Sequence, residues 1–394
     1  MVYIPAHFSS LEWLINFLIL IFQKKINMYN PQPGDTLDAL DTPSMVVDLD
    51  LMEANIASML GRLLPTGVKV RPHLKTTKSP LLAQKLIDAG ATGGCVAKLS
   101  EAEVMAAGGI EDLLITCEII GKPKVARLVA LFRQHPQVKV VLDSAAGATM
   151  INQALEEAGI AAPLQVLIDL DVGQNRTGIA PGAPALELAR TIGRLKNLRL
   201  IGVQGYEGHL QHLHDRQARE ENCRASMLLL SGTADLLREA GFEIETVTTG
   251  GTGTAEFCAD CPGITEVQPG SFIFMDTDYR NALGQVFSNS LTVLATVISK
   301  QGPGRVVIDT GLKSLTTDSG YAEPKNLPDL VYTPNGDEHG TLSWKSGPGL
   351  EIGDRVEMIP SHIDPTINLH DTYYAHRKGI IEEIWPVATR GKVQ

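Results

Sequence analysis

"VKVRPHLKTTKSPLLAQKLIDAGATGGCVA" (residues 68–97) contains the repeating unit from which the fold is built. A short β-branched run, 68–72, leads into a polar turn. An apolar pattern at three-to-four spacing then follows (79–90) and ends at a glycine, as helices do. A second apolar run occupies 94–97. Strand, turn, helix and strand in this order predict a βαβ unit in a parallel sheet that is buried on both faces.

The same alternation continues to about residue 275. Further strand-like runs lie at 113–116, 138–143, 165–170, 200–206, 246–250 and 265–270. With the two runs of the first unit they make eight, and we treat an earlier run at 45–50 as a lead-in. Eight βα units of this length predict an α/β fold, a (β/α)8 TIM barrel. A doubly wound sheet is the competing architecture, but G-x-G-x-x-G is absent after the first strand.

After residue 276 the pattern changes. "LTVLATVIS", "GRVVIDTG", "DRVEMIP" and "GIIEEIW" are strand-like, with Pro, Gly and Asp between them and no helical pattern. We therefore predict three parts: a leader of doubtful status (1–28), a barrel (29–275) and a C-terminal β-strand domain (276–394). The first residues of the barrel part can also pair with the β-strand domain.

The leader contains "LEWLINFLILIF" (11–22), an apolar stretch shorter than the roughly 20 residues that span a bilayer. It has neither a basic segment before it nor a small-residue cleavage site after it, so it is a poor signal peptide. Either translation begins at Met28, or the stretch is an interfacial anchor helix. We expect no membrane-spanning role and leave it out of the fold argument.

Composition restricts the class of protein. The 394 residues carry a formal net charge of −11, and we find no concentrated basic patch, which argues against nucleic-acid binding. The five cysteines are an odd, scattered set, which favours a reducing compartment such as the cytoplasm. Cys258 and Cys261 form a single C-x-x-C, which is weak support for zinc without a second pair and is typical of two ordinary loop thiols.

Catalytic residues of a barrel lie at the carboxyl ends of its strands. Here those ends provide a lysine, an arginine, a glutamine, a tyrosine and histidines: Lys75, Arg176, Gln204, Tyr206, His209 and His212. After the seventh strand, "TTGGTGT" (248–254) can turn several backbone N–H groups and threonine hydroxyls inward, an arrangement that binds phosphate. Its candidate contacts are Thr249, Gly251, Thr252 and Gly253.

A phosphate loop, a lysine, an arginine and a tyrosine on one rim predict a site for pyridoxal 5'-phosphate. Lys75 would form the Schiff base, and Arg176 would face the phenolic oxygen of the ring. Tyr206 or the amide of Gln204 would hold the ring. Lys78, three residues after Lys75, is interpreted as a solvated lysine at a helix start. A sugar- or metal-binding barrel in which Lys75 is idle is the alternative.

Several motifs together resemble the alanine-racemase-type (fold III) pyridoxal phosphate enzymes, and among them the branch of D-threonine aldolases and eukaryotic-type D-serine dehydratases. They are "DTPSMVVDLDLMEANI", "RPHLKTTKSP", "DVGQNRTGI", "GYEGH", "TTGGTGT" and "EVQPGSFIFMD", and the resemblance extends from about residue 40 to the C-terminus. The family pattern around the lysine is often H-x-K-T-H-K. Thr77 takes the place of the second histidine here. The second histidine of the pattern is therefore not essential in this chain.

"IPSHIDPTINLHD" (359–371) places His362 and Asp364 two residues apart, on one side of a strand if the segment is extended. An imidazole and a carboxylate on one face can begin a divalent-cation site. The resemblance implies that this motif binds a metal beside the cofactor. Family dehydratases tend to have H-x-C and aldolases H-x-D, so Asp364 favours an aldolase, and it favours Mn²⁺ or Mg²⁺ over Zn²⁺ because carboxylates suit harder ions.

The resemblance thus implies a metal- and pyridoxal-phosphate-dependent lyase that cleaves D-threonine and D-allo-threonine to glycine and an aldehyde. His212 is the expected base, with His209 as the second choice. The alternative is a D-serine or D-threo-3-hydroxyaspartate dehydratase, and a non-catalytic pyridoxal phosphate carrier is a further one. The resemblance also implies a homodimer whose two chains both line each site.

Overall fold

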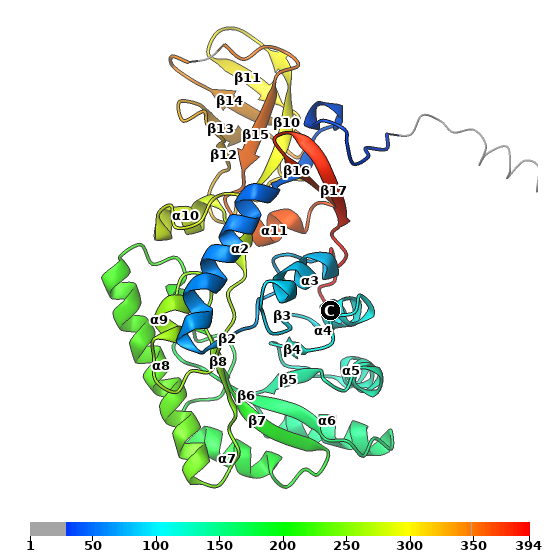
Figure 1. Cartoon of the computed structure of the whole chain (residues 1–394), viewed down its shortest axis with the longest axis vertical. Helices are drawn as coiled ribbons and strands as arrows, with labels where there is room; N and C mark the ends of the chain where they lie inside the picture. The colour runs from blue at the N-terminus through cyan, green and yellow to red at the C-terminus, as the bar shows by residue number, and fades with distance from the viewer. Residues whose placement is uncertain (1–28, 348) are drawn as a thin grey trace, which may run out of the picture.

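The computed structural model of the chain describes residues 29–347 and 349–394, so the apolar stretch 11–22 lies outside it. Two β-rich layers make up the fold, a barrel and a second sheet stacked on its rim (Figure 1). In the described part of the chain, no helix combines the length and the apolar character needed to cross a membrane.

The barrel consists of eight parallel strands in the spatial order β2-β9-β8-β7-β6-β5-β4-β3. A parallel bridge between His73 and Cys95 joins the two outer strands and closes the sheet. The predicted (β/α)8 barrel is confirmed. The strands are β2 (Lys69–Val70), β3 (Gly94–Val96), β4 (Leu113–Ile115), β5 (Lys139–Leu142), β6 (Leu164–Leu170), β7 (Leu198–Gly205), β8 (Thr246–Thr249) and β9 (Glu266–Val267).

Helices alternate with these strands and cover the outside of the barrel (Figure 1). In α3, Pro80 occupies the first turn after Ser79, and Leu82, Ala83 and Leu86 form the buried face. The helices are α2 (Leu49–Leu63), α3 (Pro80–Asp88), α4 (Leu99–Ala107), α5 (Lys122–Gln134), α6 (Ala145–Glu157), α7 (Ala183–Ile192), α8 (Arg216–Glu239), α9 (Ala255–Ala259) and α10 (Thr277–Leu283).

The second sheet has the order β13-β14-β11-β10-β1-β16-β17, and β15 pairs with both β10 and β12. Its strands are β1 (Ser44–Asp48), β10 (Leu291–Lys300), β11 (Arg305–Ile308), β12 (Glu323–Pro324), β13 (Val331–Pro334), β14 (Gly340–Ser343), β15 (Arg355–Ile359), β16 (Thr372–Arg377) and β17 (Ile380–Pro386). The run treated above as a lead-in is β1, which lies antiparallel to β10 and parallel to β16.

Two expectations from the sequence are wrong. The region after residue 276 was expected to lack helices, yet it contains α10 and a short helix, α11 (Ile363–Ile367), between β15 and β16. Lys78 is not solvated. It has a positive φ of 48°, is buried, and its Nζ donates to Oε1 of the buried Glu101 at 2.9 Å. The helices α10 and α11 were not expected because a helix of one or two turns carries too few residues for a periodic pattern to be visible.

Arg71, directly after β2, reinforces the place where the barrel closes. Its guanidinium is buried and donates to Glu266 of β9 and to Asp112, which immediately precedes β4. The Arg71 Nε–Glu266 Oε2 and Arg71 Nη1–Asp112 Oδ1 distances are both 2.9 Å. Because only an isolated bridge closes the sheet between β2 and β3, these ion pairs hold strands on both sides of the closure together.

Replacing Arg71 with Met should lower the free energy of unfolding by about 3–5 kcal/mol, because Glu266 would remain buried without its partner. Arg62→Met is the matched control. Arg62 pairs with Glu256 at the surface, so its loss should cost about 1 kcal/mol or less. Urea unfolding followed by circular dichroism compares the two variants. Equal losses would contradict a special role for Arg71 in closing the barrel.

Candidate active site

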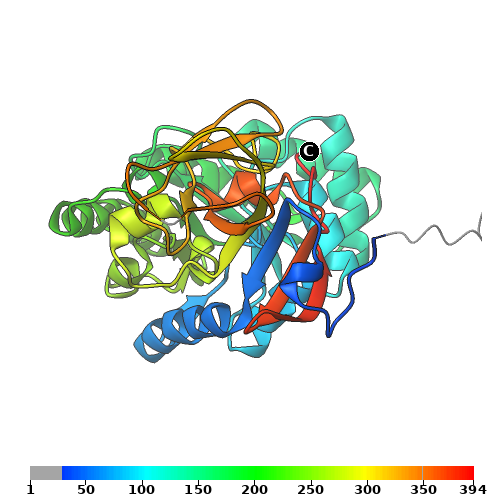
Figure 2. The ribbon, with the colours of Figure 1, turned by 90° about the horizontal axis from the view of Figure 1, so that it is seen from above.

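A cavity of about 480 Å³ lies at the carboxyl ends of the barrel strands, beneath α11. Figure 1 shows α11 between the two layers, and Figure 2 shows it over the middle of the barrel. Side chains from both layers line the cavity. From the residues predicted above they include Lys75, Arg176, Gln204, Tyr206, Gly251, Thr252, His212, His362 and Asp364.

Lys75 reaches the cavity from the turn after β2. Its Nζ lies 3.0 Å from Oδ2 of Asp364, and Thr76 donates a hydrogen bond of 2.7 Å to Oδ1 of the same carboxylate. Burial is the largest single effect on the pKa of Asp364 and raises it, but the charge of Lys75, the hydrogen bond from Thr76 and smaller effects together outweigh burial and lower this pKa to about 2. In return, Asp364 raises the pKa of Lys75. The pair is therefore ionised throughout the physiological range.

His362 and Asp364 line the same cavity, but not as residues of a strand. His362 is the N-cap of α11 and Asp364 lies in its first turn, so the expected strand geometry is wrong. The Nδ1 atom of His362 lies 2.5 Å from Oδ2 of Asp318, which leaves Nε2 as the other ring nitrogen. The carboxylate of Asp276 fixes the start of α11 by accepting from the backbone N–H of Ile363 at 2.9 Å.

His212 follows the short turn after β7 and faces the cavity. Its Nδ1 lies 3.1 Å from Oδ2 of Asp278, and its ring centroid lies 4.2 Å from that of Tyr279. Burial lowers the pKa of His212 below its usual value, although Asp278 acts in the opposite direction. His209 is exposed and is not among the residues that line the cavity. Of the two candidate bases, only His212 therefore has the geometry for the role.

Arg176, Tyr206 and Gln204 lie together on one wall. The Arg176 guanidinium is 5.6 Å from the centre of the Tyr206 ring, a cation–π distance. Gln204 donates to Asp169 Oδ1 at 2.9 Å and accepts from Gln268 at 3.1 Å, so both ends of its amide are fixed. Burial raises the pKa of Asp169 to about 7.

The threonine–glycine segment 248–254 lies beside the cavity but does not turn all its donors inward. Gly251 N–H donates to Thr254 Oγ1, and Gly253 N–H donates to Gln211 Oε1. Thr249 is buried behind the cavity wall, with its hydroxyl bonded to Glu207. Only Gly250, Gly251 and Thr252 of this segment line the cavity. The expectation that Thr249 and Gly253 face a ligand is therefore wrong, because both residues are engaged in the loop's own support.

Comparisons with known proteins agree with this geometry. Residues 47–278 match the alanine racemase N-terminal domain, and residues 290–376 match the putative serine dehydratase domain. The chain is 41% identical over 364 residues to a D-threonine aldolase from an Arthrobacter species, covering 91% of this chain and 95% of that protein.

The chain belongs to the alanine racemase-type family of D-threonine aldolases and related dehydratases. It is an enzyme of the lyase class. A solved D-threonine aldolase from Filomicrobium marinum has a TM-score of 0.89 and 35% identity, with 92% of this chain and 100% of that one covered. A D-threo-3-hydroxyaspartate dehydratase from Delftia sp. HT23 has a TM-score of 0.81 and 31% identity, with 89% and 98% covered.

Several residues of this lyase's site were not found from the sequence. Gln268, Ser271 and Tyr279 line the cavity. Asp276 and Asp318 contact Ile363 and His362, respectively, at the start of α11. Asp276 carries one usable signal, since an aspartate three residues before Tyr279 is a good N-cap and its Oδ1 indeed accepts from Tyr279 N–H. Asp318 has no local signal, because its partner is 44 residues away in the sequence.

His73 gives this lyase a pH-dependent stability. Burial, with the nearby charge of Lys75, lowers the pKa of His73 from 6.5 to about 3. The unfolded chain therefore takes up a proton on His73 at a higher pH than the folded one. The contribution of neutral His73 to the free energy of unfolding is complete above pH 6.5 and is lost as pH falls toward 3. In His73→Gln, the stability difference from wild type should be about 2 kcal/mol smaller at pH 5 than at pH 8.

Urea unfolding at the two pH values measures this difference. His214→Gln is the control, because His214 is exposed and its surroundings change little on unfolding. A constant difference between wild type and His73→Gln at both pH values would show that His73 takes up its proton in the folded enzyme as easily as in the unfolded chain.

Proposed function

We propose that this lyase uses pyridoxal 5'-phosphate and a divalent metal ion to cleave D-3-hydroxy-amino acids, and that D-threonine and D-allo-threonine are converted to glycine and an aldehyde. The observation that carries the proposal is the 3.0 Å contact between Lys75 Nζ and Asp364 Oδ2. It brings the amine suited to the cofactor and the carboxylate suited to the metal into one cavity with His212.

The residues present fit pyridoxal phosphate. Lys75 would hold the cofactor, and Arg176, Gln204 and Tyr206 would surround its ring. Thr252 and Ser271 line the cavity, and their backbone N–H groups donate to no acceptor within the described residues, so these groups are available for a phosphate. When bound, the cofactor supplies an electron sink for the carbanion that forms at the substrate's Cα.

His362 and Asp364 fit a divalent metal, since both are buried or half-buried and both face the cavity. A carboxylate with one imidazole favours Mn²⁺ or Mg²⁺, and Zn²⁺ is also compatible. The metal would supply Lewis-acid polarisation of the substrate's β-hydroxyl. His212, kept neutral by its lowered pKa and with Nδ1 3.1 Å from Asp278 Oδ2, would accept the hydroxyl proton at Nε2.

Dehydration of D-serine or D-threo-3-hydroxyaspartate is the alternative function, because this chain is similar both to a D-threonine aldolase and to a D-threo-3-hydroxyaspartate dehydratase. Asp364 favours the aldolase. In the family that this chain resembles, aldolases tend to have H-x-D at this position and dehydratases H-x-C, and this chain has H-x-D. A non-catalytic carrier is disfavoured, since a carrier needs neither a base nor a metal motif.

We also expect the enzyme to act in the cytoplasm as a homodimer. The scattered free cysteines and the family resemblance support these two expectations. The substrate is a small amino acid, for which a cavity of about 480 Å³ leaves room beside the cofactor.

Incubation with D-threonine, pyridoxal phosphate and Mn²⁺ should yield glycine and acetaldehyde in equal amounts. The identity of the products tests the function, because 2-oxobutyrate and ammonia would instead establish a dehydratase. Lys75→Ala is the control and should form neither set of products. A Lys75→Ala protein with full activity would overturn the assignment of the cofactor lysine.

Asp318→Asn should weaken Mn²⁺ binding by about 10-fold or more, because a carboxylate bonded to a ligating imidazole fixes its ring and tautomer. Isothermal titration calorimetry with Mn²⁺ measures the dissociation constant directly. Asp337→Asn, in an exposed loop of the same domain, is the control and should bind as wild type does. Unchanged affinity in Asp318→Asn would indicate that His362 does not bind the metal through the nitrogen opposite Asp318.

A further inference from the structure

Glu207 is a fully buried carboxylate that faces away from the cavity. It lies between β7 and a short turn, Gly208–Leu210, in the segment "GYEGH". Its Oε1 accepts from Thr254 Oγ1 at 2.5 Å and from Gln211 Nε2 at 3.2 Å, and its Oε2 accepts from Thr249 Oγ1 at 2.9 Å. All three donors belong to, or support, the threonine–glycine loop.

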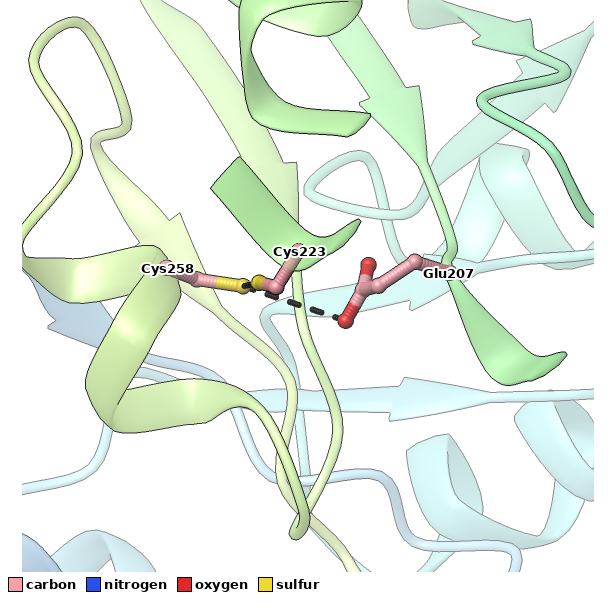
Figure 3. Close-up of side chains that lie close together, drawn as sticks. All are labelled: Glu207, Cys223 and Cys258. Carbon is pink, nitrogen blue, oxygen red and sulfur yellow. Dashed lines mark hydrogen bonds between the residues drawn. The ribbon is translucent and has the colours of Figure 1, made fainter. Parts of the chain in front are cut away.

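Two buried thiols complete the surroundings of this carboxylate (Figure 3). Cys258 Sγ lies 3.8 Å from Glu207 Oε1 and 3.4 Å from Cys223 Sγ. These spacings would permit a metal ion, but the carboxylate already accepts three hydrogen bonds from hydroxyl and amide groups, and burial raises the pKa of the Cys258 thiol. The cluster is therefore better explained as a support for the loop than as a metal site.

Gln211 transmits the constraint to the loop backbone. It donates to Glu207 and to Thr254, and its Oε1 accepts from Gly253 N–H at 2.8 Å. A Cβ at Gly251 or Gly253 would lie 2.5 or 2.4 Å from atoms of Gln211. The glycines are thus needed so that the loop can pack against Gln211. Thr252, between them, lines the cavity, and its N–H donates to no acceptor in the part of the chain that the structure describes.

We propose that Glu207 is a positioning residue for the cofactor phosphate: by accepting the donors on the back of the loop, it fixes the backbone so that the N–H of Thr252 points at the phosphate. The inference rests on the proposed function. Without the acceptor, Thr249, Thr254 and Gln211 would each be left with a buried unsatisfied donor, and the loop would rearrange to satisfy them.

The test compares pyridoxal phosphate with pyridoxal, which has the same aldehyde but no phosphate. Dissociation constants for both are measured with cofactor-free wild type and Glu207→Gln by absorbance and fluorescence titration. The advantage that the phosphate gives to binding is the dissociation constant for pyridoxal divided by the dissociation constant for pyridoxal phosphate. In Glu207→Gln this ratio should fall by about tenfold, while pyridoxal itself binds as it does to wild type.

Glu256→Gln is the matched control. Glu256 lies on α9 next to the same loop, but it is partly exposed and pairs with Arg62 at the surface, so the ratio should not change. A second pair of variants guards against a Glu207→Gln protein that does not fold. Thr254→Val removes one donor and should lower the ratio, whereas Thr254→Ser keeps the hydroxyl and should preserve it.

Equal weakening of both ligands in Glu207→Gln would overturn the inference and leave only a general structural role. A ratio that rises would also overturn it, since that result would mean that repulsion between the carboxylate and the phosphate dominates. Wild-type protein that binds neither ligand would overturn the proposed function and, with it, this inference. Wild-type protein that binds both, with an unchanged ratio in Glu207→Gln and Thr254→Val, would overturn this inference alone.

Discussion

The ion pair between Lys75 and Asp364 is the contact on which the site depends. One partner comes from the rim of the barrel and the other from a helix of the second layer, so the pair exists only when the two layers are docked correctly. Docking is in turn fixed by hydrogen bonds around the lysine turn. Tyr373 of β16 donates to the carbonyl of Thr77 at 2.7 Å, and Thr389 N–H donates to the carbonyl of Lys78 at 3.0 Å.

The path of the chain makes this docking intrinsic to folding. β1 is an interior strand of the second sheet, between β10 and β16, although it precedes the whole barrel in the sequence. From β1 onward the chain therefore leaves the second sheet, forms the barrel, and returns to that sheet. Since β1 pairs with strands about 250 and 330 residues later, the second sheet is complete only after the barrel between them has been made.

The sequence predicted the barrel and the change to strands, and most of the site residues predicted from it line the cavity, because each of these features is encoded locally. A strand end, a lysine after it and an H-x-D pair can be recognised within a few residues. The strand geometry assigned to His362 and Asp364 was wrong because a five-residue helix leaves no periodic signal. The positioning carboxylates Glu207 and Asp276 were missed for a different reason. Each has one partner nearby in the sequence, Gln211 and Tyr279 respectively. Their other partners lie 42 to 47 and 87 residues away, and only the folded chain brings these together.

The buried acids of this site fall into two groups according to what surrounds them. Asp364 faces a lysine, and its pKa is lowered to about 2. Asp169 and Asp276 have amide and hydroxyl partners but no adjacent cation, and burial raises the pKa of each to about 7. Only Asp364 among these three is therefore a full anion near neutral pH. The cations that line the cavity are Lys75, Lys98 and Arg176, so the positive charges outnumber this one negative charge. An acidic protein thus presents a cavity suited to a doubly charged phosphate because the buried carboxyl groups of Asp169 and Asp276 serve as hydrogen-bond acceptors and do not line the cavity.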